Sequence, residues 1–262
     1  MGELLFLGAG LGDETDLSPR AMEGLRTSNR VFAEEYTSRL ADGTIERLER
    51  ELGRPIERLG RAELEAETSV LHALAAVPRV ALIVAGDPFV ATTHVHLRVA
   101  AERAGHTWRY LAGPSILTAA VSYLGLMHYR FGRVVSLPFA DPGFDPVSPF
   151  EAIGRNRAAD SHTLVLLDLR PSDGRYLRAA EALARFDEAR SVMAKVERAT
   201  EFGVVARVGR PDVAAWWGTR AQLAGSDFGP PLHCLVVPAP ELHFQEREAV
   251  ARWRPPARDR GG

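Results

Sequence analysis

One short run of the sequence, residues 80–85, is apolar at every position. A strand without a polar face is typical of a parallel sheet that helices cover on both sides. Further strand-like segments occur at residues 4–7, 31–33, 108–111, 134–137, 163–167, 203–208 and 232–237. Helical patterns separate several of them, for example residues 95–104, which end before Gly105, and residues 115–124. We therefore predict an α/β fold with mostly parallel sheets.

The length of the chain, 262 residues, suits two modest α/β domains better than one minimal core. The turn Ala112-Gly113-Pro114 is the best boundary between them. We predict an N-terminal domain of residues 1–112 and a C-terminal domain of residues 113–254. Residues 255–262, rich in Pro, Arg and Gly, are expected to form a frayed tail. A ligand cleft between the two domains is the natural place for a cofactor.

The second half of the chain allows two more specific predictions. Residues 138–149 hold four prolines and a glycine, so we predict a loop there. A helix is expected to follow the strand at residues 163–167. Its buried face is predicted to carry Leu177, Ala180, Leu183 and Phe186.

The charge balance excludes some partners. The 32 Lys+Arg and 34 Asp+Glu give a net charge of -2, so the chain as a whole has no attraction for nucleic acid or an acidic membrane, and only a local basic patch stays open. No apolar stretch approaches the ~20 residues of a membrane span, and the first residues, with Glu3 and a short apolar run, are unlike a signal peptide. We expect a cytoplasmic protein. The single cysteine, Cys234, lies in an apolar run and is expected to be a reduced, packed thiol.

A glycine-rich segment, residues 8–13, follows the first apolar run and at first resembles a dinucleotide-binding loop. The pair Glu34-Glu35 even stands where such folds hold a ribose. However, Asp13 takes the place of the third glycine. The next helix is predicted to begin late, with Ser18 as its N-cap and Pro19 as its first residue, which disfavours a pyrophosphate site.

A second loop, residues 85–94, displays a carboxylate at the end of the strand at residues 80–85. Gly86-Asp87-Pro88 turns the chain, and Thr92 or Thr93 is predicted to cap the next helix. Open α/β folds bind their ligands at this edge of the sheet.

Together, residues 7–14 and 85–94 resemble the tetrapyrrole methylase superfamily of class III methyltransferases and, more narrowly, the diphthine synthase family. The resemblance extends from residue 3 to about residue 248. Further agreeing stretches are residues 34–38, 113–116, 129–133, 162–169, 206–209, 227–233 and 238–244.

The resemblance implies S-adenosylmethionine as the methyl donor. The cofactor-binding residues that it implies are Leu11, Asp87, Val90, Ser115, Ile116, Leu167, Val208 and His233. Two of them, Asp87 and Ser115, offer polar anchors, and most of the others offer apolar walls. No residue is identified as a catalytic base. His94 and His96 are two apart on the predicted helix and point about 200° from each other, so they cannot share a metal ion, and no metal is expected.

The resemblance also implies an acceptor, the amino group of the aminocarboxypropyl-modified histidine of translation elongation factor 2, and a homodimer. Residues 170–175 and 206–210 depart from the family pattern, which leaves acceptor recognition less defined. Three alternatives stay open. They are a class III methyltransferase for a corrin or ribosomal RNA, a dinucleotide-dependent oxidoreductase, and a non-catalytic module.

Two further features, Arg207 and the pair Trp216-Trp217, have two interpretations each. Arg207 either pairs with an acid such as Asp227 or meets the carboxylate of the acceptor, and Arg130 is a second candidate for that carboxylate. The pair Trp216-Trp217 is interpreted as packing or as a dimer surface.

Overall fold

The computed structural model describes residues 1–144, 146–188 and 201–255. Contacts divide the chain into two units. The first comprises Met1–Ile116, Arg170–Arg175 and Gly209–Pro211, and the second comprises Leu117–Leu169, Tyr176–Val208 and Asp212–Gly262. Apart from its first residue, the predicted tail at residues 255–262 lies outside the described residues. Within the described part, no helix has the length and apolarity to cross a membrane.

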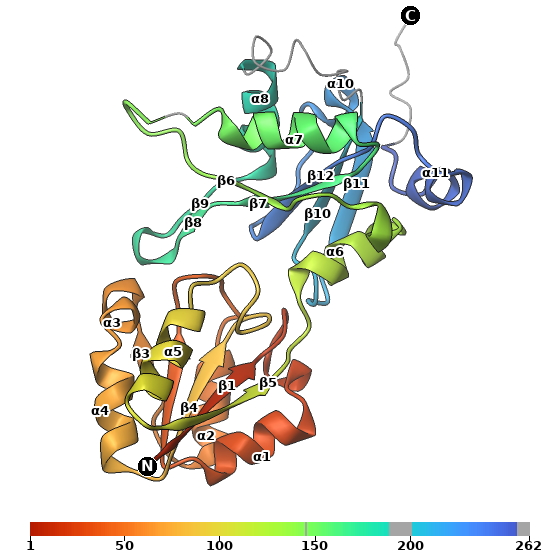
Figure 1. The fold of residues 1–262 in the computed structure, drawn as a ribbon. Helices are drawn as coiled ribbons and strands as arrows, with labels where there is room; N and C mark the ends of the chain where they lie inside the picture. Colours follow the sequence, from red (N-terminus) through yellow and green to blue (C-terminus); the bar gives the residue numbers. More distant parts are fainter. Residues whose placement is uncertain (145, 189–200, 256–262) are drawn as a thin grey trace, which may run out of the picture. The chain divides into compact units, whose positions relative to one another are not determined.

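The first unit is built on a five-stranded sheet in which every strand pair is parallel, as predicted. Its strands, in spatial order, are β3 (Glu57–Leu59), β2 (Arg30–Glu34), β4 (Arg79–Val84), β1 (Glu3–Gly8) and β5 (Thr107–Leu111) (Figure 1). All the loops that follow these strands therefore leave from one edge of the sheet.

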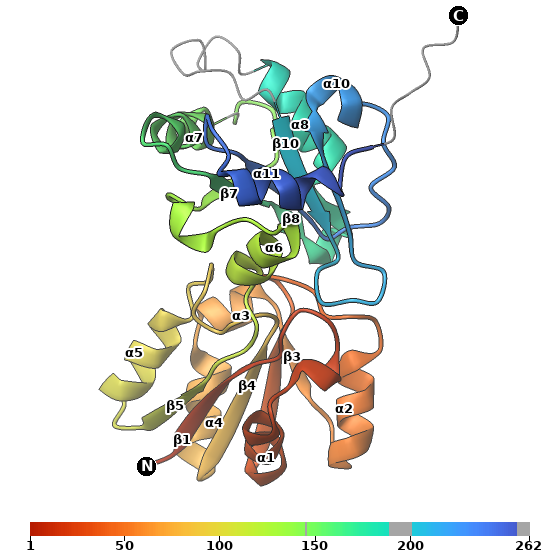
Figure 2. The same ribbon diagram turned by 90° about the vertical axis from the view of Figure 1, so that its right-hand side faces the viewer.

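Helices cover both faces of this sheet, because successive residues of each strand point to opposite sides. On β1, Leu4 and Phe6 pack in one cluster with α3 (Arg61–Glu65), α4 (Thr68–Ala76) and α5 (Val95–Arg103). Leu5 and Leu7 pack in the other with α1 (Pro19–Thr27) and α2 (Thr44–Leu52). Figure 2 shows α5 and α2 on opposite sides of the sheet.

The second unit also has a five-stranded sheet, but it is mixed. Its spatial order is β11 (Ala214–Thr219), β10 (Glu201–Ala206), β12 (His233–Val237), β7 (Thr163–Leu167) and β6 (Val135–Leu137). Only β6 and β7 are parallel, and the other pairs are antiparallel. The prediction of mostly parallel sheets is wrong here. Between β10 and β11 there are only residues 207–213, too few for the crossover of about a dozen residues that parallel neighbours need.

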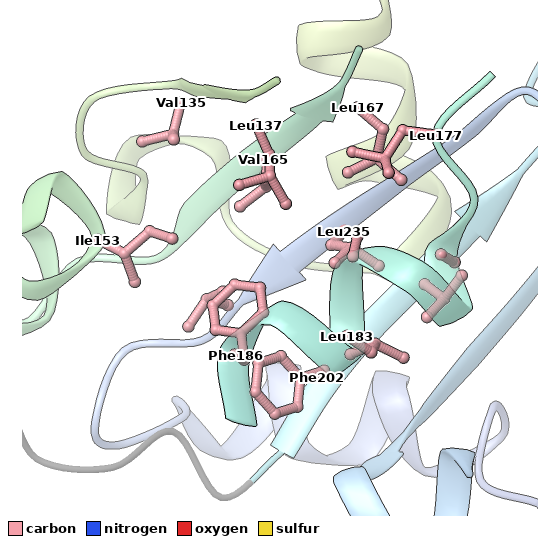
Figure 3. Close-up of a cluster of buried hydrophobic side chains, with 14 of the residues drawn as sticks. Val135, Leu137, Ile153, Val165, Leu167, Leu177, Leu183, Phe186, Phe202 and Leu235 are labelled. Carbon is pink, nitrogen blue, oxygen red and sulfur yellow. The ribbon is translucent and has the colours of Figure 1, made fainter. Parts of the chain in front are cut away.

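One face of this second sheet carries the main core of the unit. Helices α7 (Ser148–Ala158), α8 (Ala179–Glu188) and α10 (Arg220–Leu223) cover it. In Figure 3, Leu183 and Phe186 of α8 lie beside Phe202 of β10 and Leu235 of β12. Phe186 contacts Phe202 edge to face, with ring centroids 5.1 Å apart.

Two local predictions in this region are wrong. Ala180 is exposed, and the buried apolar positions of α8 are Ala179, Ala182, Leu183 and Phe186. The helix begins at Ala179, two residues after Leu177, and its buried face carries Ala179 instead of Ala180. The predicted loop at residues 138–149 ends early because α7 begins at Ser148, and Pro149 fits its first turn, where no backbone donor is needed.

The opposite face of the second sheet is packed around Trp217, which is fully buried. In the β10–β11 register Trp217 stands opposite Gly203, and a Cβ atom on Gly203 would lie 2.9 Å from the indole ring. Leu124 of α6 (Ile116–Leu124) also lies on this side. The carbonyl oxygen of Trp253, just beyond α11 (Phe244–Ala251), accepts a hydrogen bond from the backbone N–H of Trp217. Trp216 packs on the other face, against Phe228. The pair is thus a packing element.

The remaining regular segments are short. They are the 3-10 turns η1 (Glu14–Asp16), η2 (His128–Arg130) and η3 (Pro171–Asp173), and a ribbon of β8 (Leu169–Arg170) and β9 (Arg175–Tyr176). Cys234 is buried in β12 with a free thiol, as predicted, and burial raises its pKa to about 12.

Candidate functional site

Three loops meet at the carboxyl edge of the first sheet, and glycines let their backbones touch. A Cβ atom on Gly113 would lie 2.4 Å from the carbonyl oxygen of Gly86. One on Gly8 would lie 2.3 Å from the backbone nitrogen of Gly113. Gly10 and Gly86 also exchange backbone hydrogen bonds. No other residue type fits such approaches, so the loops after β1, β4 and β5 are held together.

This contact gathers the predicted cofactor residues of the first unit. A Cβ atom on Gly86 would lie 3.9 Å both from Leu11 Cδ2 and from the carbonyl oxygen of Pro114. The predicted residues on the three loops are Leu11, Asp87, Val90, Ser115 and Ile116. All except Asp87 are half-buried, and Asp87 is buried. Apolar surface therefore lies beside one carboxylate.

The carboxylate of Asp87 is held by two donors. Its Oδ1 accepts a hydrogen bond of 3.0 Å from the backbone N–H of Phe89, and its Oδ2 accepts one from the hydroxyl of Tyr110 on β5. This hydrogen bond, with burial and the charge of Asp87, raises the pKa of Tyr110 to about 12. Tyr110 was not among the residues predicted from the sequence. The only signal was a polar aromatic residue near the end of the predicted strand at residues 108–111.

The glycine loop after β1 is closed by the protein's own carboxylate. Asp16 Oδ2 accepts hydrogen bonds from the backbone N–H groups of Leu11, at 2.9 Å, and Gly12, at 2.8 Å. Helix α1 begins only at Pro19, with the Ser18 hydroxyl as its cap, as predicted. The donors that a pyrophosphate would need in this loop are therefore occupied.

The acid expected for a ribose is occupied as well. Glu34 ends β2, is buried, and accepts hydrogen bonds from Tyr36 N, Thr37 N and Thr37 Oγ1, each 2.5 Å long. The carboxylate of Glu34 thus stabilises the turn that directly follows β2. Both halves of a dinucleotide site are thus used internally, which disfavours the oxidoreductase alternative on structural grounds.

In the second unit, the predicted residues Leu167, Val208 and His233 lie at one edge of the sheet. Leu167 ends β7, His233 begins the antiparallel strand β12, and Val208 follows β10, whose Ala206 pairs with His233. Leu167 and His233 are buried, and Val208 is half-buried.

The imidazole of His233 has both nitrogens engaged. Its Nδ1 accepts a 3.1 Å hydrogen bond from the backbone N–H of Ala179, so its Nε2 donates to the carbonyl oxygen of Pro230, at 3.0 Å. Burial lowers its pKa, which favours this neutral form. His233 therefore offers a ligand its ring surface and backbone rather than a free ring nitrogen.

Val208 directly precedes a segment that packs in the first unit. Gly209 has a positive φ of 87°, and a Cβ atom on Gly12 would lie 2.4 Å from its carbonyl oxygen. Gly209 itself contacts Leu11, because a Cβ atom on it would lie 2.7 Å from Leu11 Cβ. The glycine loop and residues 209–211 are thus one packed substructure.

The two arginines proposed for the acceptor carboxylate already have acidic partners. Arg207 Nε lies 2.6 Å from Asp212 Oδ2, and its Nη1 donates to the carbonyl oxygen of Phe228. Asp212, not Asp227, is its partner. Arg130 Nη1 lies 2.6 Å from Glu246 Oε2. We therefore assign neither guanidinium to the acceptor.

The helix start after Asp87 differs from prediction. The N-cap residue of α5 is His94, so neither Thr92 nor Thr93 occupies that position. The Thr92 hydroxyl donates to the carbonyl oxygen of Pro88, at 2.8 Å, and accepts a long 3.5 Å hydrogen bond from the backbone N–H of His94. His94 is buried, with Nδ1 2.9 Å from the same carbonyl oxygen, whereas His96 is exposed. In the residue ranges that the structure describes, no three His, Cys, Asp or Glu side chains are placed to hold a metal ion.

Comparison with known proteins identifies the family. Residues 3–224 match the model of the Tetrapyrrole (Corrin/Porphyrin) Methylases. The diphthine synthase of Methanothermobacter thermautotrophicus is 40% identical over 250 residues, which cover 94% of this chain and 93% of that protein. The diphthine synthase of Methanosphaerula palustris is 41% identical over 245 residues, covering 94% of this chain and 96% of that protein.

A solved structure agrees with these matches. A crystal structure of a diphthine synthase has a TM-score of 0.87 to this chain at 34% identity, and the match covers 97% of each chain. The similarity thus extends through both units and all the loops described above. The chain belongs to the tetrapyrrole methylase family and, within it, to the diphthine synthases.

Proposed function

We propose that the protein transfers methyl groups from S-adenosylmethionine to the amino group of the aminocarboxypropyl-modified histidine of translation elongation factor 2. The observation that carries this proposal is the similarity to diphthine synthases over 94% of the chain. We also propose that the protein acts in the cytoplasm as a homodimer.

The residues at the edge of the first sheet fit such a cofactor. Asp87 accepts two hydrogen bonds from the protein, and a carboxylate has about four lone-pair sites, so it has capacity for further donors. The ammonium and ribose hydroxyl groups of S-adenosylmethionine are such donors. Leu11, Val90 and Ile116 would contact its apolar parts. We propose that Ser115, Leu167, Val208 and His233 contact the same molecule.

When bound, S-adenosylmethionine supplies a methyl group that its sulfonium has already activated. The task of this chain is then to hold the acceptor nitrogen in line with that carbon and to exclude water. The glycine contacts at Gly8, Gly86 and Gly113 serve this purpose, because they fix the three loops without flexible side chains between them. Asp87 supplies the polar anchor.

Calorimetry with S-adenosylhomocysteine, the demethylated product, tests cofactor binding. We expect one site per chain. Asp87→Ala should weaken binding by about 1–3 kcal/mol, the usual cost of leaving buried polar partners unpaired. Asp42→Ala is the matched control, because the side chain of Asp42 is 83% exposed. Binding of NAD without binding of S-adenosylhomocysteine would contradict the proposal.

A second experiment tests the acceptor. Elongation factor 2 that carries the unmethylated precursor should gain mass in successive methyl steps when incubated with the enzyme and S-adenosylmethionine. The same factor with an unmodified histidine is the control and should gain none. Equal labelling of both forms, or labelling of ribosomal RNA or a corrin, would reject this acceptor and keep the methyltransferase assignment.

A further inference from the structure

The hydroxyl of Tyr110 is the only side-chain donor to Asp87 among the hydrogen bonds found in the described residues. The other donor to that carboxylate, the backbone N–H of Phe89, belongs to the same loop and moves with it. Tyr110 comes from β5, the edge strand of the sheet, which pairs with β1 along its whole length. It therefore ties the carboxylate to the rigid sheet.

Tyr110 also contacts the loop through its ring. The rings of Tyr110 and Phe89 have centroids 5.3 Å apart and are tilted by 33°. Phe89 in turn packs against Phe6 of β1 at 4.8 Å. Phe89 is thus held by several rings, whereas the second oxygen of Asp87 depends on one phenol. Loss of that hydroxyl should free the carboxylate and leave the aromatic packing in place.

The exposure of the two residues supports a role in binding. Asp87 is only 6% exposed, but Tyr110 is 41% exposed, which is unusual for a residue whose purpose is core packing. A phenol is a suitable clamp because it stays protonated, and so remains a donor, well above neutral pH. Its hydroxyl engages only one of the lone-pair sites of the Asp87 carboxylate, so the carboxylate keeps capacity for further donors of a ligand.

We propose that Tyr110 is a positioning residue for the methyl donor, which orients the carboxylate of Asp87 toward the ammonium or hydroxyl groups of the cofactor. This inference rests on the proposed function. Tyr110 lies outside the loops after β1 and β4, so the motifs in those loops do not include it.

Affinity for S-adenosylhomocysteine, measured by calorimetry, tests the inference. Tyr110→Phe keeps the ring contact with Phe89 and removes one charge-assisted hydrogen bond, so binding should weaken roughly tenfold. Tyr129→Phe is the matched control, since Tyr129 is 81% exposed in the second unit, and should bind like the wild type. In an Asp87→Asn background, Tyr110→Phe should cost less than about twofold, because the two groups act as a pair.

An ultraviolet titration provides a readout that general destabilisation would not mimic. The wild type should contain one tyrosine, missing in Tyr110→Phe, that ionises near pH 12. In Asp87→Asn the pKa of this phenol should fall toward about 10.

The outcomes separate the two proposals. If the wild type binds S-adenosylhomocysteine and Tyr110→Phe binds it equally well, the inference is overturned and the proposed function stands. If the wild type does not bind it, both fail. If Tyr110→Phe does not fold, the Asp87→Asn titration decides, and an unchanged phenol pKa overturns the inference.

Discussion

Asp16 shows how one residue decides what a glycine loop binds. Its carboxylate accepts the N–H groups of Leu11 and Gly12. Gly10 makes the approach feasible, because a Cβ atom there would lie 2.4 Å from Asp16 Cβ. The sequence revealed the glycines and, through Asp13 and Ser18, a reason to doubt a phosphate site. It did not reveal which acid takes the donors, because that choice depends on the fold of the turn.

Asp16→Ala is therefore expected to leave two backbone donors without their partner. The free energy of unfolding, measured with urea, should fall by about 1–3 kcal/mol. Asp16→Asn is the matched control and should lose clearly less, because its amide oxygen can accept both hydrogen bonds. Equal losses in the two variants would show that Asp16 does not act through this contact.

The partners of the site residues were also beyond the sequence. Asp87 and Tyr110 are 23 positions apart, and the hydrogen bond between them follows from the pairing of β5 with β1. The resemblance identified positions such as His233, but not that its ring nitrogens bond to Ala179 and Pro230. A motif identifies matching positions in the sequence. Predicting which side chains form hydrogen bonds across a sheet also requires the register of its strands.

At the scale of elements, hydrophobic runs predicted where strands lie but not their direction. The run at residues 232–237 became β12, which is antiparallel to both of its neighbours, β10 and β7. An apolar run with both faces buried looks the same in either direction, so the pattern alone cannot distinguish the two sheets. Helix α2 was not predicted, although Ile45 and Leu48 are spaced as on one helix face and are buried. Helix α7, which follows the proline-rich loop, was not predicted either.

Strand β10 packs closely against Trp217 and Leu124 at Gly203. A Cβ atom there would lie 2.9 Å from two atoms of the Trp217 ring and 3.1 Å from Leu124 Cδ1. Gly203→Ala should overpack this face and lower the free energy of unfolding by about 1–3 kcal/mol. With Trp217→Leu already present, the same change should cost much less, as denaturation of all four variants would show. Strictly additive losses would argue against the clash.

For the whole molecule, three buried histidines link stability to pH. Burial is the main cause that lowers the pKa values of His94, His162 and His233 below their usual 6.5. The unfolded chain, with ordinary histidines, binds their protons at higher pH than the folded protein does. The contribution of these histidines to the free energy of unfolding is therefore fully present above the pKa of histidine in the unfolded chain. It decreases as the pH falls below about 6.5.

Urea denaturation between pH 8 and pH 5 tests this dependence. The free energy of unfolding should be flat above pH 7.5 and fall below pH 6.5, by up to about 1.4 kcal/mol per pH unit for each histidine. In His162→Gln the free energy of unfolding should depend less steeply on pH, because one fewer proton is taken up on unfolding. A stability that does not change between pH 7 and pH 5 would contradict the assignment of neutral, buried imidazoles.

The proposed homodimer is tested by light scattering at micromolar concentration. We expect a mass near twice the 28.6 kDa of one chain. Since Trp217 is buried inside the second unit, Trp217→Leu should lower the free energy of unfolding and leave the mass of the folded protein unchanged. A mass equal to one chain would reject the dimer and leave the catalytic proposal unaffected.

The distribution of indole rings gives the two units separate optical signals. Of the four tryptophans, only Trp108 lies in the first unit, with the guanidinium of Arg98 5.1 Å from its ring centre. Trp216, Trp217 and Trp253 lie in the second unit. The fluorescence of a Trp108→Phe variant would therefore report on the second unit alone, and its difference from the wild type on the first. Whether the two units lose their structure in one step or in succession thus becomes visible in the emission of a single sample.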